Sequence, residues 1–307
     1  MRTILILFIL VLFTSCGKNK TEETREAIDV ALTYLSSGEC REAINVLEEV
    51  RGGNDPVYLQ VLASAYACLA SFDEIRFIDH DLSNINSTSP GSILQSISVL
   101  ELSPESEADS FAYSSVRSGI NIVLNSKKQT ERTAEFGSRK SGDMGVQALI
   151  LSIVNFGKFL NYFGNVSATG VKGGGSGTNS CFINYNDPRA QALTGISTGA
   201  CTGDTDGHQE LVQSTAVGKR RLCEGLMLIT NIIDILNNID LSHSSSLSVL
   251  EDVATQVNTY RTTAEAAGLG TLINMTSQKE CETHLGTPAH LLDMEYLYAL
   301  VFETGLQ

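Results

Sequence analysis

The sequence predicts an all-α protein, and three observations support this prediction. Apolar residues recur at the i, i+3, i+4 and i+7 spacing along most of the chain, and glycine or proline separates the periodic segments. No segment shows the strict apolar–polar alternation of a half-buried strand. Apolar residues make up 42% of the 307, which is enough to build a core. We therefore expect nine to eleven helices.

The first segment of the chain has the layout of an export signal. Arg2 precedes an unbroken apolar run, residues 4–13, which is too short for a membrane span of about 20 residues. The run ends in Thr14, Ser15 and Cys16, and this arrangement resembles the signal of bacterial lipoproteins, although Phe13 replaces the usual leucine. The resemblance implies a signal peptide over 1–15, cleavage before Cys16, lipid on Cys16 and a polar tether over 16–24. An ordinary signal peptide with a chance cysteine is the alternative.

The next segment, residues 25–82, is predicted to form antiparallel helical hairpins, broken at Gly38 and at Gly52-Gly53, with Pro56 in the first turn of a helix. The pattern resembles tetratricopeptide repeats, on these residues: Ala31, Tyr34, Gly38, Ala43, Leu47, Val50 and Pro56, then Leu62, Ala63, Tyr66, Ala70 and Phe72. This resemblance implies a protein-binding face, with Tyr34, Tyr58 and Tyr66 as candidate partner contacts. A generic antiparallel helix pair is the alternative.

Residues 83–307 are predicted to form a larger helical domain. We expect a helix from Pro104 to Leu124, a solvated basic segment over 126–142, and helices over 208–239 and from Pro288 to the end. A break with an N-cap is expected at 244–246. Residues 143–163 are apolar on most sides, interrupted by Gln147, Asn155 and Lys158, which predicts a buried central helix rather than a membrane span. Residues 164–207 are rich in glycine and are expected to form a long irregular loop.

Six cysteines remain once Cys16 carries lipid, and an even number in an exported protein favours disulfides. Fifteen connectivities are possible, and spacing suggests Cys40–Cys68, Cys181–Cys201 and Cys223–Cys281. Six unpaired thiols are the alternative. A zinc site is disfavoured because no C-x-x-C spacing occurs.

The acidic segment around Asp204, Asp206 and His208 is the leading candidate for a metal site, since its opening resembles that of a calcium loop. The remaining calcium-loop spacing is missing, so helix capping by Asp206 is the simpler interpretation. Cys281, His284, His290 and Asp293 offer a second set of ligand types, which competes with a disulfide at Cys281. We predict no cofactor and no catalytic residue, because no histidine lies in a catalytic motif.

A net charge of −14 argues against nucleic-acid binding, which needs a basic face. We expect a lipoprotein of the bacterial envelope, held in the outer membrane by acyl and diacylglycerol chains and facing the periplasm. Its expected function is that of a non-enzymatic scaffold that binds another envelope protein or a peptide. A solute- or lipid-handling component associated with a transporter is one alternative, and an enzyme acting on the envelope is the other.

Overall fold

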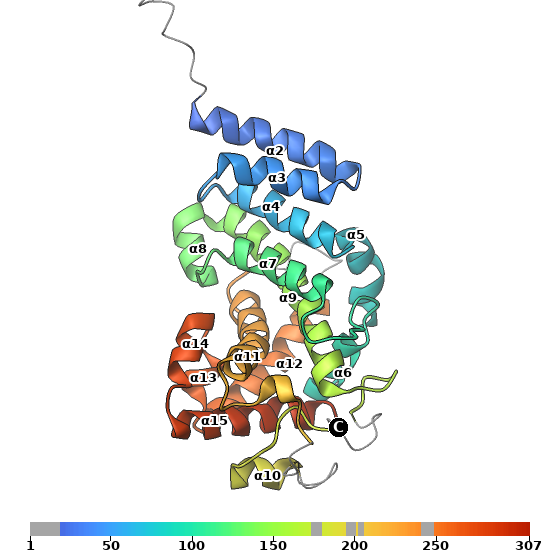
Figure 1. Ribbon diagram of the computed structural model, residues 1–307, viewed down its shortest axis with the longest axis vertical. Coiled ribbons are helices and arrows are strands. Elements are labelled where there is room, and N and C mark those ends of the chain that lie inside the picture. Colours follow the sequence, from blue (N-terminus) through green and yellow to red (C-terminus); the bar gives the residue numbers. More distant parts are fainter. Residues whose placement is uncertain (1–18, 173–179, 195–200, 202–205, 241–248) are drawn as a thin grey trace, which may run out of the picture.

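The protein is described by a computed structural model that covers residues 19–172, 180–194, 201, 206–240 and 249–307. Over these residues the chain is all-α, with fourteen α-helices and no strand, so the predicted class is confirmed. The helices form an elongated stack, with α2 (Lys20–Ser36) at one end and α10 (Pro188–Thr194) and α15 (Pro288–Tyr298) at the other (Figure 1). The predicted signal peptide and Cys16 lie outside the described residues.

The N-terminal end of the stack consists of α2, α3 (Cys40–Val50) and α4 (Pro56–Leu69). Asn19 accepts a hydrogen bond from the Thr21 N–H and caps α2, which begins at Lys20 within the segment 16–24 that is predicted as a tether. The breaks at Gly38 and at 52–53 occur as predicted, and Asp55 caps α4 directly before Pro56.

Small residues allow the first three helices to pack closely. Ala31, Ala43 and Ala63 are completely buried, one on each helix. The Cys40–Cys68 disulfide joins the start of α3 to the end of α4, so these helices run antiparallel. The hairpin arrangement is thus present, and the resemblance to tetratricopeptide repeats stays a prediction.

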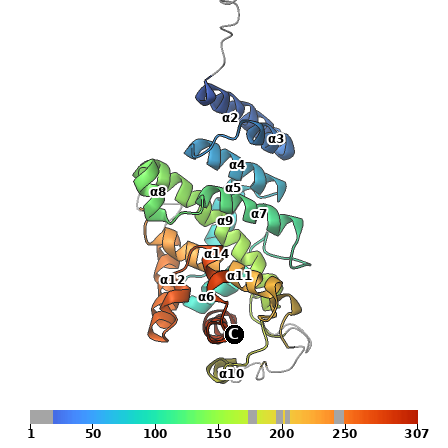
Figure 2. The same cartoon turned by 60° about the vertical axis from the view of Figure 1, so that its left-hand side comes forward.

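A central helix, α9 (Ser138–Gly164), organises the rest of the fold. It contacts α4, α6 (Pro90–Ser98), α7 (Phe111–Leu124), α8 (Gln129–Phe136) and α11 (Ala216–Leu236) (Figure 2). By length and hydropathy it is the one described helix that could cross a membrane, but 89% of its most apolar window is buried inside the protein. The prediction of a buried central helix is confirmed.

Several predicted boundaries are wrong. The helix expected from Pro104 begins after Ser110, whose side chain caps it by accepting a hydrogen bond from the Tyr113 N–H. The helix expected over 208–239 is interrupted, and α11 begins after a second N-cap at Thr215. The basic segment 126–142 is helical rather than a loop, since it contains α8, and Lys128, Arg139 and Lys140 are exposed as expected whereas Arg132 is completely buried. Arg132 is held by main-chain carbonyl oxygens rather than by an acid, with Leu124 O at 3.3 Å.

The remaining elements are short or lie near the C-terminus. They are α5 (Glu74–Arg76), η1 (Phe77–Asp81), η2 (Leu82–Asn84), η3 (Gln209–Leu211), α12 (Val249–Ala266), α13 (Gly270–Ile273), α14 (Gln278–His284) and η5 (Ala299–Glu303). The helices of one to two turns raise the total above the nine to eleven expected. The break predicted at 244–246 lies outside the described residues.

All three suggested cysteine pairs lie at disulfide distance, with Cα–Cα separations of 5.6, 6.0 and 5.8 Å. The disulfide prediction is confirmed, and it excludes a thiolate metal site at Cys281. Cys181–Cys201 spans part of the predicted irregular loop, in which residues 188–194 form α10.

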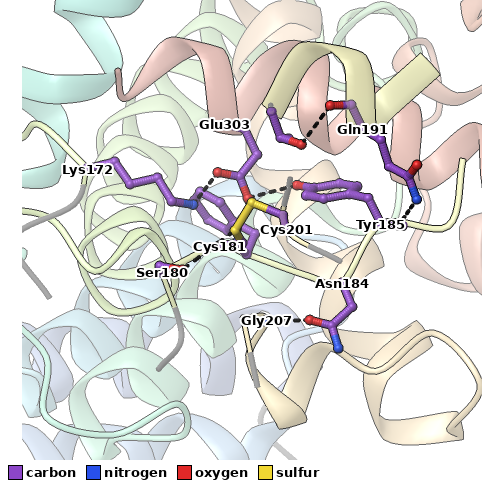
Figure 3. The surroundings of a disulfide bond; sticks show 11 residues. Lys172, Ser180, Cys181, Asn184, Tyr185, Gln191, Cys201, Gly207 and Glu303 are labelled. Atoms are coloured by element: carbon purple, nitrogen blue, oxygen red, sulfur yellow. Dashed lines mark hydrogen bonds and ion pairs between the residues drawn. A yellow bond between two sulfur atoms is a disulfide. The ribbon is translucent and has the colours of Figure 1, made fainter. Parts of the chain in front are cut away.

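Figure 3 shows the surroundings of the Cys181–Cys201 disulfide, where a buried carboxylate holds several segments together. Glu303 accepts hydrogen bonds from the Phe182 N–H at 2.6 Å and from the Tyr185 hydroxyl at 2.9 Å. It also pairs with Lys172, and both side chains are completely inaccessible to solvent. This network ties the C-terminal end of the chain to the ends of the irregular segment.

Candidate functional site

The candidate site is a pocket of about 550 Å³ between α7, α9, α11 and the chain that enters α14. This volume is within the range of small-molecule sites. Two glycines fix the spacing of the surrounding helices. A Cβ on Gly119 of α7 would lie 3.0 Å from the Ala63 carbonyl oxygen and 3.4 Å from Leu151, and one on Gly225 of α11 would lie 2.4 Å from Phe159. Both flanking helices therefore approach their neighbours closely at these points.

Asn155 lies midway between these contacts, four residues after Leu151 and four before Phe159, and therefore on the same face of α9. Asn155 lines the pocket and is completely buried, and neither its Nδ2 nor its Oδ1 has a hydrogen-bond partner among the described residues. Leaving such groups unpaired costs roughly 1–3 kcal/mol each. An unpaired amide at this point is therefore a specific feature that needs an explanation.

The other two polar residues that interrupt the apolar run of α9 each have at least one partner, although Gln147 Oε1 has none among the described residues. Gln147 Nε2 donates to the Gln60 carbonyl oxygen at 3.1 Å and to Ser64 Oγ at 2.8 Å. Lys158 Nζ lies 2.7 Å from a Glu105 carboxylate oxygen. Among the described residues, the fold thus pairs Lys158 and the Gln147 amide nitrogen, and it leaves both polar atoms of Asn155 buried and unpaired where the residue lines the pocket.

A second unpaired group lines the pocket beside an ionic cluster. The Tyr113 hydroxyl has no partner in the described chain, and burial together with nearby Glu224 raises the pKa of this hydroxyl well above its usual value. Glu224 is itself nearly buried and pairs with Arg117, while Arg221 NH1 lies 3.0 Å away. Tyr113 therefore stays neutral and can both donate and accept.

The ionic cluster carries more positive than negative charge. Arg117, Arg220 and Arg221 surround Glu224, and Asp109 pairs with Arg221. Arg220 Nε lies 3.6 Å from Glu224, beyond hydrogen-bond distance, and about half of its side chain is exposed at the pocket. This end of the pocket can accept an anion on a chain whose overall charge is strongly negative.

Apolar side chains line part of the pocket wall away from the cluster. They come from α7 and α11, and they are Ile120, Leu124, Met227 and Leu228, with the polar residues Asn121, Ser126, Lys127 and Asn231 beside them. Asn231, also a lining residue, is satisfied within its own helix by the Met227 carbonyl oxygen at 2.8 Å. The lining of the pocket therefore combines an anion-accepting cluster, an unpaired buried amide and several apolar side chains.

None of the site residues suggested by the sequence lines this pocket. Tyr58 is buried and donates to the Leu47 carbonyl oxygen at 3.0 Å, so its side chain is engaged within the helical hairpins. Tyr66 donates to Glu48 Oε1 at 2.8 Å and Tyr34 packs half-buried against the core, so these two lie near the surface. Their predicted partner contacts stay predictions.

The acidic segment does not assemble a described metal site. Asp204 lies outside the described residues, and the main-chain carbonyl oxygen of Asp206 accepts from the Cys181 N–H. His208 packs against the rings of Tyr162 and Phe163, and burial lowers the pKa of its imidazole to about 4. Asp206 does not cap a helix as we expected, because the adjacent caps are His208 and Thr215.

Two other groups of potential metal ligands occur among the described residues. Cys181, Cys201 and Glu303 lie together, but the disulfide removes both thiolates. His80, Asp81 and Glu101 are the second group, in which His80 and Glu101 are exposed and Glu101 pairs with Arg76 at 2.5 Å. The second predicted set is also not a chelate, because the His284 and His290 rings stack face to face at 3.7 Å.

The sequence contained one signal for the pocket, which was Asn155 within the apolar run. It gave no indication of Tyr113, Glu224 or the three arginines, which come from helices far apart in the chain. Comparison with protein-family models, with curated proteins and with solved structures gives no match for this chain.

Proposed function

We propose that this chain is a lipid-anchored protein of the bacterial envelope whose helical body binds a small molecule in the pocket floored by Asn155. The observation that carries the proposal is the buried amide of Asn155, whose donor and acceptor both lack partners among the described residues and which lines a pocket of ligand size. Binding would satisfy groups that the fold leaves unpaired, which is the usual arrangement of polar groups in a largely apolar ligand site. The lipoprotein-like signal supports the location in the cell envelope. We therefore prefer the solute-handling role to the scaffold role.

Native mass spectrometry tests this proposal. The wild-type protein and Asn155→Leu are extracted without denaturation from the producing bacterium, and the masses that remain bound are compared. We expect a small molecule on the wild type and its loss from Asn155→Leu. Asn161→Leu is the matched control, since Asn161 is on the same helix but both its side-chain atoms are paired, with Ser98 and Glu105. Equal retention by the two variants, or no bound molecule on any form, would contradict the proposal.

The protein-interaction scaffold is the second candidate, and one observation favours it. The terminal helix α2 leaves Val30 39% and Leu32 48% exposed, whereas the outer face of a terminal repeat is normally polar. A photo-crosslinker at position 32 should capture one defined envelope protein in living cells, and Val30→Ser should reduce that capture. Capture that is unchanged by Val30→Ser would refute the scaffold role of this face.

A further inference from the structure

The chemistry along the pocket narrows the ligand to one class, and this inference rests on the proposed function. We propose that the ligand is a small carboxylic acid that contains an internal amide and an apolar tail, as in an N-acyl amino acid or a short apolar peptide. The carboxylate would lie at Arg220, the amide on Asn155, and the tail against Ile120 and Leu228.

The unpaired amide of Asn155 selects the middle of the ligand. An asparagine side chain presents an acceptor oxygen beside an NH₂ donor, so its natural complement is another group that offers N–H and C=O together. Asn155 is completely buried, and both atoms lack partners among the described residues. A ligand ester would satisfy only the donor and would leave the Asn155 oxygen unpaired, so an amide is preferred.

The arginines select the anionic end. Arg117 and Arg221 are engaged with Glu224 and Asp109, while the Arg220 guanidinium is beyond hydrogen-bond distance of Glu224. Arg220 donates no side-chain hydrogen bond within the described chain and half of its side chain is exposed, so its planar fork is free to bind a carboxylate through two N–H groups.

The length of the pocket sets the size of the ligand. Arg117 and Leu124 are seven residues apart on α7, and Arg220 and Leu228 are eight apart on α11. At 1.5 Å per residue these spans are about 10–12 Å along each helix. The arginines and the apolar residues Leu124 and Leu228 are therefore separated by the length of an acylated amino acid, and Asn155 of α9 also lines the pocket.

A matched series of probes tests this assignment by isothermal titration calorimetry on the protein lacking its lipid. The first probe is N-hexanoyl-leucine. The second replaces its amide N–H by an ester oxygen, and the third blocks its carboxylate as a methyl ester. Leucyl-leucine, with its charged amino group, distinguishes a peptide from an N-acylated source. We expect the wild type to bind the first probe about tenfold or more tightly than the second or third, as expected when one buried polar group loses its partner.

The variants locate each preference. Asn155→Leu should bind the amide and the ester equally and keep its preference for the free acid. Arg220→Gln should bind the acid and the methyl ester nearly equally and keep its preference for the amide. Equal binding of all probes by the wild type, or preferences that both variants leave unchanged, would overturn the assignment. If native mass spectrometry finds a bound molecule that Asn155→Leu loses, but no probe binds, the ligand class is wrong and the proposed binding function stands. If there is no bound molecule and no probe binds, the ligand class and the binding function are both wrong.

Discussion

Replacing Asn155 by leucine should stabilise the unliganded protein while removing its ability to bind. In the folded state the Asn155 amide is shielded from solvent and has no partner in the described chain, whereas in the unfolded state water satisfies both atoms. Unpaired buried polar groups cost about 1–3 kcal/mol in proteins, and leucine has a similar size and no polar atoms. We expect the free energy of unfolding to rise by about 1–3 kcal/mol and the melting temperature by about 2–5 °C.

The assay is chemical and thermal unfolding of the lipid-free protein with its disulfides intact, followed by far-UV circular dichroism because the chain contains no tryptophan. Asn161→Leu gains the same helix propensity on the same helix. It leaves the Ser98 carbonyl oxygen and the Glu105 N–H without their partner, so its stability should fall by about 1–3 kcal/mol. If Asn155→Leu loses as much stability as Asn161→Leu, the Asn155 amide is already satisfied in the folded protein and our reasoning is refuted.

Four further outcomes are expected. Cys16→Ser should move the protein from the membrane fraction to the soluble fraction, and unchanged membrane retention would refute the anchor. Thiol titration of the denatured, unreduced protein should find no free thiol, whereas a value near six would refute the three disulfides. The His208 imidazole has its folded pKa lowered from 6.5 to about 4 by burial, so the unfolded state binds the proton first and stability falls as pH decreases through this window. Protonation of His208 in the unfolded state should lower the free energy of unfolding by about 2 kcal/mol between pH 7 and pH 5. In His208→Phe the fall in this free energy over the same pH range should be smaller by about 2 kcal/mol. Lys172→Met should cost about 3–5 kcal/mol by leaving the buried Glu303 carboxylate unpaired, and adding Glu303→Gln should recover part of it, which denaturant midpoints will measure.

The fold class and several elements could be predicted because they depend on local patterns. The apolar run over 143–163 is long enough to define α9, and glycine or proline marks the ends of α2, α3 and α4. The cysteine pairs were also predictable, since each suggested pair joins cysteines that follow one another in the sequence, at separations of 28, 20 and 58 residues. Helix starts were less predictable: a serine cap at 110 set the start of α7, although Pro104 is the stronger sequence signal.

The pocket could not be predicted because it depends on the tertiary arrangement. Tyr113, Asn155 and Glu224 are separated by more than forty residues from one another and meet only when α7, α9 and α11 pack. The sequence shows that Asn155 is polar within an apolar run. It does not show that Gln147 Nε2 and Lys158 have partners while both polar atoms of Asn155 have none in the described part of the chain. Arg132 presents the same difficulty, since a basic segment normally indicates a solvated surface and main-chain carbonyl oxygens bury this one.

The central claim is that Asn155 is a ligand-binding group, and nuclear magnetic resonance of its side-chain amide tests this most directly. The two Nδ2 proton signals can be assigned by their loss in Asn155→Leu and then followed while N-hexanoyl-leucine or the co-purified molecule is added. We predict that both signals shift on binding, with the Asn161 side-chain signals unchanged. Saturating ligand that leaves the Asn155 signals where they were would contradict the account.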